Sequence, residues 1–362
     1  MNGPAETDQT VTAAQTELIV YRQQDVVCCV LTEKGKPVEV IRATAEQVLH
    51  RQDIVLGMVR QILPALSCAF IDIGDDHDAL LPIAEASPDI KAGQRIIVQV
   101  RKETAPGKGH RVTTRIELPG PYAVLLPFDH PRRRSKLRGL PRHEQDALYS
   151  KDLERLGNIW QEILLDSRTG SVPRPLYPFG DPCYTALITW VRPELVRIRV
   201  DDISLYNELY RQLTELMPQS LPLLQYQRRE GDFGLAAILG LTDLDEQLKR
   251  RTVLLDGGGF IVIDRTEALT AIDVNSGRDT RGRSGQQLRL RTNLQAAAVI
   301  AGQLRLRNIG GMVVIDFLRS TQEADLLQIE QTFRQSLEQD RARLKLFGFS
   351  AMGLFELTRS AL

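Results

Sequence analysis

The chain has 362 residues, about two to three times the common size of a domain, so it can bury more than one hydrophobic core. Hydrophobic residues make up 43% and charged residues 25%, which is ordinary for a globular protein and excludes a small disulfide-stapled scaffold. The 46 basic and 46 acidic side chains give a formal net charge of zero. Overall charge therefore indicates no partner, and nucleic-acid binding would need a locally basic surface.

The cysteines and the N-terminal segment bear on the cellular compartment. None of the four cysteines lies in the paired spacing of a zinc site: Cys28, Cys29, Cys68 and Cys183. Residues 1–15 are polar and acidic, which predicts a disordered tail and not a signal peptide. No apolar run approaches the roughly 18 residues needed to span a bilayer. We expect a cytoplasmic protein, with peripheral membrane contact left open.

Strand patterns dominate the first third of the chain. The runs TELIVYR and DVVCCVLT, separated by Gln23 and Gln24, predict two strands, and GKPVEVIRA predicts a third. Five further short strands follow between Asp53 and Arg115, with Gly, Asp and Pro between them. This number and spacing predict a small five-stranded β-barrel, a fold that often binds oligonucleotides.

A basic stretch comes next and has no apolar periodicity. The segment HPRRRSKLRGLPRH carries five basic residues within seven positions: Arg132, Arg133, Arg134, Lys136 and Arg138. It is either a solvated charged loop or a segment that contacts phosphates without reading sequence. Apolar spacing then predicts a helix over 143–165, followed by a proline-rich interruption.

The rest of the chain alternates strands and helices. Strands are expected over 187–191 and 195–202, then a helix over 204–216 with Ser204 as its N-cap. The C-terminal third predicts an α/β layer. Its expected elements are a helix over 241–252, strands over 252–256, 259–265, 268–275 and 312–318, and helices over 286–307 and 323–343. The triplet from Gly257 to Gly259 lacks dinucleotide-loop spacing and predicts a hairpin turn.

Two of these strands end in acidic residues. Asp273 and Asn275 are two positions apart, so they share one face of a strand, and Asp316 ends another strand. Neighbouring strands lie about 4.8 Å apart, so the two carboxylates can meet around one ion. Two carboxylates, an amide and room for water suit Mg²⁺, which can activate water and stabilise phosphodiester charge. The alternative is that each aspartate only caps a turn or helix.

The sequence resembles the ribonuclease E/G family. The resemblance is carried between Leu244 and Arg359 by DRTEALTAIDVNSGRDTRG, RTNLQAAAVIAGQLRLRNIGGMVVIDF, QDRAR and SAMGLFELTR. Upstream, LSCAFIDIG and ALLPI resemble the family's S1 RNA-binding domain, and GKGHRVTTRIELPGPYAVLLP continues the similarity.

The resemblance implies an α/β composite fold: an RNase H-like subdomain interrupted by an S1 (OB-type) β-barrel, followed by a DNase I-like α/β catalytic subdomain. The expected division is a disordered tail over 1–15, a first RNase H-like segment over 16–52, the S1 barrel over 53–116, a shortened 5′-sensor-like region and linker over 117–182, a second RNase H-like segment over 183–250, and the DNase I-like subdomain over 251–362.

The resemblance also implies roles for single residues. Asp273 and Asp316 would hold Mg²⁺, while Asn275 would orient the scissile phosphate or the attacking water. The RNA-contacting positions would be Phe70, Leu80, Lys108, Gly120, Val124 and Arg343. The alternative for Phe70 is a structural residue in the barrel core. The alternative for Arg343 is an ordinary exposed arginine on the last helix. Leu80 replaces a second aromatic of the family, which predicts a weaker RNA grip.

Two family features are not found in the sequence. Gly120 and Val124 remain from one wall of the pocket that recognises a 5′-monophosphate, but only about thirty residues separate Pro127 from Trp160, so the pocket's other wall looks deleted. The C-P-x-C zinc-link motif is not found up to Leu362. We therefore expect no zinc-linked dimer and treat a monomer and another kind of dimer as equally open.

Three functions are consistent with these residues. The first hypothesis is a Mg²⁺-dependent endoribonuclease that cuts single-stranded RNA and leaves a 5′-phosphate and a 3′-hydroxyl, in RNA processing or decay. The second is an RNA-binding protein of the same fold with weak or lost cleavage. A phosphodiesterase acting on DNA is a more remote third, since the preference for RNA comes from the resemblance alone.

Overall fold

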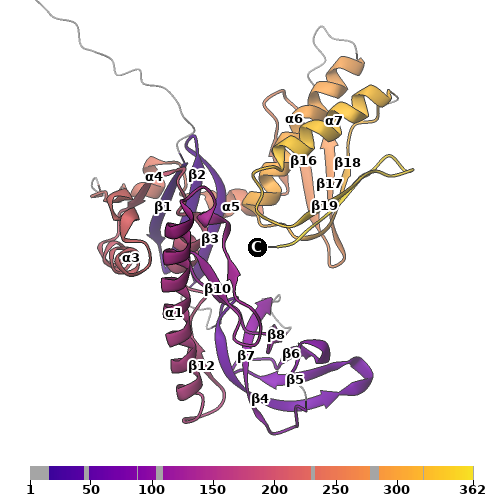
Figure 1. The fold of residues 1–362 in the computed structure, drawn as a ribbon. Coiled ribbons are helices and arrows are strands. Elements are labelled where there is room, and N and C mark those ends of the chain that lie inside the picture. Colours follow the sequence, from indigo (N-terminus) through magenta and orange to yellow (C-terminus); the bar gives the residue numbers. More distant parts are fainter. Residues whose placement is uncertain are drawn as a thin grey trace, which may run out of the picture. The chain divides into compact units, whose positions relative to one another are not determined.

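A computed structural model describes residues 16–44, 49–87, 89–102, 109–229, 233–277, 285–320 and 322–361 of the chain (Figure 1). Contacts between residues divide the chain into two compact units. Unit 1 consists of Met1–Cys29 and Ile41–Gly234, and unit 2 consists of Val30–Val40 and Leu235–Leu362.

A five-stranded sheet contains the N-terminal strands. Its order is β14-β13-β1-β2-β3, and its strands are β1 (Thr16–Gln23), β2 (Val26–Glu33), β3 (Lys36–Thr44), β13 (Leu195–Val200) and β14 (Leu224–Tyr226). The predictions for β1, β2, β3 and β13 are confirmed. β1 and β13 run parallel with Leu18 opposite Ile198, so buried apolar residues far apart in sequence share one layer. The hairpin tip Val30–Val40 groups with unit 2 by its contacts.

Two helices follow in unit 1, and one of them corrects a prediction. Helix α2 (Pro182–Trp190) occupies the segment where a strand was expected over 187–191. Its start is strongly specified, because Pro182 needs no backbone partner there and the Asp181 carboxylate accepts a hydrogen bond from the Tyr184 amide at 2.6 Å. Helix α3 (Ile203–Leu216) is confirmed, but its N-cap is Asp202 and not Ser204.

The predicted barrel is present and closed. Its strands are β4 (Ile54–Leu63), β5 (Cys68–Asp72), β6 (Ala79–Pro82), β7 (Arg95–Lys102) and β8 (Arg111–Thr113). Closure follows because β4 pairs with both β5 and β7, while β8 pairs with both β6 and β7. Alternate side chains fill the interior, among them Val59, Ile71 and Leu81. Strand β12 (Arg174–Tyr177) extends the barrel sheet at β4.

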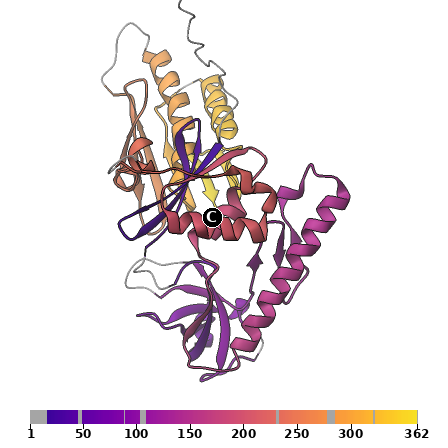
Figure 2. The same ribbon diagram turned by 90° about the vertical axis from the view of Figure 1, so that its left-hand side faces the viewer.

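A long helix lies beside the barrel strands in unit 1. Helix α1 (Arg142–Asp166) confirms the predicted helix within about a residue at each end, and it runs alongside β10 and β12 (Figures 1 and 2). Three short strands form a separate sheet: β9 (Leu118–Pro119), β10 (Ala123–Leu125) and β11 (Arg132–Arg133). The 3-10 segments are η1 (Pro64–Leu66), η2 (Ile83–Glu85), η3 (Ser135–Leu137) and η4 (Pro218–Leu223).

Unit 2 is a mixed six-stranded sheet with helices on one face. The strand order is β15-β16-β17-β18-β20-β19, and the bounds are β15 (Thr252–Leu254), β16 (Phe260–Arg265), β17 (Leu269–Asn275), β18 (Gly311–Asp316), β19 (Leu344–Phe349) and β20 (Phe355–Arg359). Helices α6 (Gly285–Leu306) and α7 (Glu323–Ser336) lie side by side over the sheet (Figure 1). Two short helices precede β15: α4 (Leu235–Ile238) and α5 (Leu244–Lys249).

The end of α7 differs from the prediction. The helix was expected to continue to residue 343, but it ends at Ser336, and β19 and β20 were not predicted at all. Beyond that end, the Asp340 carboxylate accepts hydrogen bonds from the Ala342 amide and from the Arg359 guanidinium, which holds the segment that leads into β19. No Gly or Pro marks this stop in the sequence, so the local pattern remains helical.

The described architecture is mixed α/β with a closed, OB-like five-stranded barrel that fits an S1 domain. No helix in the described ranges combines the length and apolarity needed to cross a membrane.

Candidate carboxylate site and nucleic-acid surfaces

The two predicted acidic residues meet on neighbouring strands of unit 2. Strands β17 and β18 run parallel, and their register places Asp273 directly opposite Asp316. Neighbouring strands lie about 4.8 Å apart, so both carboxylates can reach one ion. Ile272, Val274 and Ile315 point into the core beneath α6 and α7, so the alternating aspartates point to the opposite, open face.

The third predicted residue is part of the same group. Asn275 is two residues beyond Asp273, and its amide Nδ2 donates a hydrogen bond to the Asp273 carboxylate at 2.7 Å. This contact fixes the orientation of the carboxylate and leaves the amide oxygen of Asn275 directed elsewhere. The structure therefore brings Asp273, Asn275 and Asp316 together, although they come from two strands separated in sequence by α6.

Core packing fixes the ends of these strands. Phe317, the residue after Asp316, is buried among the rings of Phe349 and Phe355. The buried side chain of Asn293 on α6 donates to the Leu318 carbonyl at 2.8 Å and accepts from the Leu318 amide at 2.9 Å. Asp316 therefore lies on backbone that is held on both sides, as a preorganised site requires. Asn293 was not singled out from the sequence, because a helical asparagine gives no local signal of this contact.

The triplet from Gly257 to Gly259 is confirmed as a hairpin turn, and it lies beside the end of β17 that carries Asn275. It joins β15 to β16, and Phe260 lies opposite Asn275. A side chain at Gly259 would meet the Asn275 carbonyl oxygen at 2.6 Å, and one at Gly277 would meet the Gly258 carbonyl oxygen at 2.1 Å. These glycines let the two turns approach each other beside the carboxylates.

The donor set suits a hard cation that keeps water ligands. Two carboxylates and an amide provide only a few protein ligands. Mg²⁺ typically binds through such a small set, and water and substrate phosphate oxygens complete its coordination. Within the described ranges no group of three or more His, Cys, Asp or Glu side chains could hold a metal by itself.

An exposed arginine lies close to the carboxylates in sequence and structure. Arg319 follows Asp316 by three residues, in the segment between the Leu318 contacts and Ser320, whose hydroxyl donates to Asp325 at 2.7 Å. The Arg319 side chain is exposed and makes no hydrogen bond or ion pair with any residue that the structure describes. Its charge is available to an anionic substrate.

The barrel carries a second group of predicted residues on its outer surface. Phe70 on β5 lies directly opposite Leu80 on β6, while the neighbouring Ala69, Ile71 and Leu81 fill the interior. Phe70 is therefore not a core residue of the barrel, and that alternative is wrong. The same row continues with Gln61 on β4 and Arg111 on β8. Arg111 lies one strand beyond Leu80 from Phe70 and pairs with Glu85 at 2.6 Å, so the row carries one aromatic ring on which a base of a single strand can stack.

Two other predicted RNA-contacting residues are not part of these groups. Lys108 lies outside the described residues. Arg343 is exposed, but it precedes β19 and is not on the last helix, so its expected position was wrong. Because β19 runs parallel to β18, Arg343 lies near Gly311, at the end of the sheet opposite to Asp316.

Gly120 lies in the turn between β9 and β10, Val124 lies on β10, and Asp152 of helix α1 holds this turn. The Asp152 carboxylate accepts hydrogen bonds from the Tyr122 and Ala123 amides, both at 2.9 Å, and the Gly120 amide donates to the Ala123 carbonyl. A side chain at Gly120 would meet the Asp152 carboxylate at 2.3 Å. The Asp152 carboxylate, which pairs with Arg155 at 3.0 Å, already fills the space beside Gly120.

The basic stretch is neither a fully solvated loop nor a free phosphate clamp. Arg132 pairs with Glu117 at 3.1 Å, and Arg133 pairs with Asp146 at 2.7 Å and lies over the Tyr149 ring. Arg134 donates to the Gly120 carbonyl and Lys136 donates to the Leu187 carbonyl. Most of these side chains therefore hold this region of unit 1 together.

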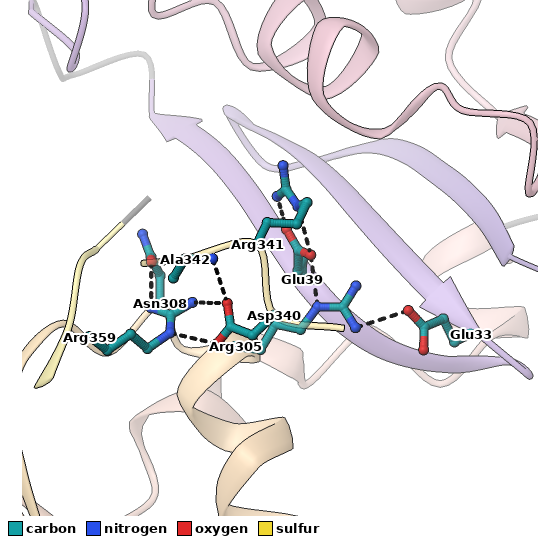
Figure 3. A network of polar contacts seen from close by, with 8 residues as sticks. All are labelled: Glu33, Glu39, Arg305, Asn308, Asp340, Arg341, Ala342 and Arg359. Carbon is teal, nitrogen blue, oxygen red and sulfur yellow. Dashed lines mark hydrogen bonds and ion pairs between the residues drawn. The ribbon is translucent and has the colours of Figure 1, made fainter. Parts of the chain in front are cut away.

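A network of buried charges supports unit 2 away from the carboxylates (Figure 3). Arg359 is fully buried and donates to Asp340 at 2.7 and 3.0 Å, as well as to Asn308 and the Ile309 carbonyl. On the hairpin tip, Glu39 accepts from Arg341 and, at 2.8 Å, from Arg305. Burial alone would raise the pKa of Glu39, but the two arginines outweigh it and lower the pKa below its usual value.

The fold and the site define an α/β protein that combines an OB-like barrel with a mixed sheet bearing a carboxylate pair. Residues 137–362 match the Ribonuclease E/G family. The chain belongs to this family.

Three relatives illustrate the similarity. Ribonuclease E of Synechocystis sp. is 34% identical over 363 residues, covering 89% of this chain and 53% of the relative. Ribonuclease E of Haemophilus influenzae is 31% identical, covering 86% of this chain and 38% of the relative. Ribonuclease G of Escherichia coli is 29% identical, covering 85% and 72%. The chain thus spans about half or less of the length of the two ribonucleases E.

Proposed function

We propose that this chain is a Mg²⁺-dependent endoribonuclease that hydrolyses phosphodiester bonds of single-stranded RNA in RNA processing or decay. The observation that carries the proposal is the register that sets Asp273 opposite Asp316 on the open face of unit 2. Structural caps for a turn would not need to be adjacent on parallel strands and exposed on the same face. Family membership supports RNA as the substrate.

The residues of the site have separate roles in the proposal. Asp273 and Asp316 would hold Mg²⁺, which when bound activates water and stabilises the charge on the phosphodiester. The Asn275 amide holds the Asp273 carboxylate in place, and its free oxygen can accept a hydrogen bond from water. Arg319 offers positive charge to a phosphate beside the pair. The proposed products carry a 5′-phosphate and a 3′-hydroxyl.

The barrel would hold the RNA through stacking. Phe70 offers a half-buried ring on the outer surface to a base, with Leu80 beside it as an apolar but non-aromatic contact. Lys108 and Arg343 stay proposed RNA contacts by family resemblance alone. The proposal further includes the RNase H-like and DNase I-like assignment of the subdomains, with the boundaries expected from the sequence, and a cytoplasmic location consistent with four free, buried cysteines.

Cleavage of a labelled single-stranded RNA, with Mg²⁺ or with chelator, tests the proposal. We expect cleavage with Mg²⁺ only, and loss of cleavage in Asp273→Asn and Asp316→Asn with RNA affinity retained. Asn275→Ala should lower kcat by roughly 100-fold or more, because a fixed polar group beside the reacting phosphate is lost. Asp264→Asn is the matched control, since Asp264 is on β16 of the same sheet but pairs with Arg251.

The rival function has its own expected result. If the wild-type chain binds the RNA tightly but leaves it intact under every metal condition, the chain is an RNA-binding protein of this fold that has lost cleavage. If it cuts single-stranded DNA as well as RNA, the substrate preference taken from the family is wrong.

A further inference from the structure

We infer that Lys345 and Phe347 on β19 form a nucleotide-binding subsite for single-stranded RNA on the open face of the unit 2 sheet. The inference rests on the proposed function, because it names where the RNA runs after it leaves the carboxylate pair. Neither residue was singled out from the sequence, since β19 itself was not predicted.

The two side chains form one exposed unit. The Lys345 Nζ lies 4.7 Å from the centroid of the Phe347 ring. Phe347 is 55% exposed, an unusual fraction for a phenylalanine within a strand. The Phe347 ring contacts the Lys345 ammonium and is open to solvent, so it offers a stacking surface for a base. The ammonium can pair with the adjoining phosphate.

The alternation along β19 decides which face they occupy. Leu344, Leu346 and Phe349 pack against the core that α6 and α7 cover. Lys345 and Phe347 are exposed between them and therefore point to the other face, which also carries Asp273 and Asp316.

The strand register gives the separation from the carboxylates. Val314 on β18 lies opposite Glu356 on β20, and Glu356 lies opposite Gly348 on β19. Phe347 is thus two strands across and about three residues along from Asp316, roughly 14 Å between Cα atoms. An RNA strand whose scissile phosphate is at the carboxylates can reach Phe347 within a few nucleotides, without leaving the sheet face.

The chemistry favours RNA over an apolar protein partner on this patch. Thr358, on β20 opposite Lys345, is polar, and Glu356 beside it is charged, so Phe347 is not part of a wide apolar surface. Met312, opposite Thr358 on β18, is an exposed apolar neighbour on the same face. An isolated ring paired with an ammonium matches a base and its phosphate.

Binding of a fluorescein-labelled oligouridylate of ten nucleotides, measured by anisotropy in the Asp273→Asn background, tests the inference without cleavage. Phe347→Ala should weaken binding at least about fivefold, and Phe347→Trp should retain it, because any aromatic face can stack. Phe347→Leu keeps the apolar area without the ring and should weaken binding like alanine. Lys345→Gln should reduce the slope of log affinity against log salt by about 0.7, the value for one phosphate contact on a single strand.

Leu327→Ala is the matched control, since Leu327 is 54% exposed on α7, on the helical side of unit 2, and should leave binding unchanged. The inference is overturned if Phe347→Leu binds as tightly as wild type, or if Lys345→Gln leaves the salt slope unchanged. It is also overturned if Phe347→Ala converts a dimer to a monomer in sedimentation without changing RNA affinity, since a second copy would then cover the patch. Wild-type protein that binds the oligonucleotide without cutting it would defeat the proposed function and leave this subsite standing.

Discussion

Asp340 shows how one buried carboxylate can hold the segment between two elements. Its carboxylate is 2% exposed and is hydrogen-bonded to the fully buried Arg359, and it also accepts from the Ala342 amide. Replacing it by alanine would leave a guanidinium buried without its counter-charge. Removing one partner of a buried ion pair destabilises a fold more than replacing both partners by apolar residues does.

We therefore expect Asp340→Ala to lower the free energy of unfolding by about 3–5 kcal/mol, measured by urea denaturation. Arg251→Ala is the control, because Arg251 and Asp264 form an exposed pair on the same sheet and should contribute little. Similar losses in both variants would show that Asp340 is not the structural residue we describe.

The barrel strands make a prediction at the scale of an element. Leu80 lies directly opposite Phe70, so a ring at position 80 would lie beside the existing ring on the outer surface. Phe70→Ala should weaken binding of single-stranded RNA by about 1–3 kcal/mol, the usual contribution of one stacked base.

Adding a second aromatic ring at position 80 should strengthen binding of single-stranded RNA. Leu80→Phe adds a second stacking face, and Leu80→Ile, which keeps the apolar character without a ring, serves as its control. Unchanged RNA affinity in Leu80→Phe, measured by anisotropy against the same oligonucleotide, would argue against RNA running over this side of the barrel.

The hairpin tip of Val30–Val40 makes the stability of unit 2 depend on pH. The pKa of Glu39 in the folded state is below its usual value of 4.5, because Arg341 and Arg305 outweigh the effect of burial. A lowered folded-state pKa means that the ion pairs stabilise the fold fully above about pH 4.5 and lose this contribution as the pH falls through the folded-state pKa.

Glu39→Gln removes the titrating group. We expect wild type to be more stable than Glu39→Gln at pH 7, with the difference shrinking as the pH falls below 4.5. Thermal unfolding at a series of pH values measures this. A difference that stays constant down to about pH 3 would mean that folding does not shift the pKa of Glu39, so that the two arginines do not stabilise its charged form.

At the scale of the whole molecule, the 5′ end of the substrate is the main question. The Tyr122 and Ala123 amides are bonded to Asp152, and Tyr184, whose burial raises its pKa to about 12, stays neutral and donates to the Pro119 carbonyl at 2.6 Å. The loop around Gly120 is thus satisfied by its own chain, with a carboxylate where an anion would need to bind.

RNA molecules with a 5′-hydroxyl and a 5′-monophosphate should therefore be cut at similar rates. Single-turnover cleavage of the two labelled substrates under identical conditions measures the ratio. A large advantage for the monophosphate would contradict this expectation. Loss of that advantage in Gly120→Ala, which would force Asp152 to move, would place the recognition at Gly120, and its retention would place it elsewhere in the chain.

The sequence by itself determined the local elements. Alternating apolar residues predicted β1, β2, β3 and the five barrel strands, and a periodic apolar face predicted α1, because these patterns depend on neighbours within a few positions. It failed at α2, where an Asp181 cap overrode β-branched residues, and at the end of α7, where no Gly or Pro marks the stop and the segment beyond the helix is held by Arg359.

The candidate site divides in the same way. That Asp273 and Asn275 share a face follows from the two-residue period of a strand. Only the tertiary structure decided that Asp316 lies opposite Asp273, that Phe70 points outward beside Leu80, and that Arg343 is at the far end of the sheet. It alone revealed Lys345 and Phe347 as an exposed pair. The physical reason is that strand order and register are set by burial of one whole face against α6 and α7, a condition that no local run of residues contains.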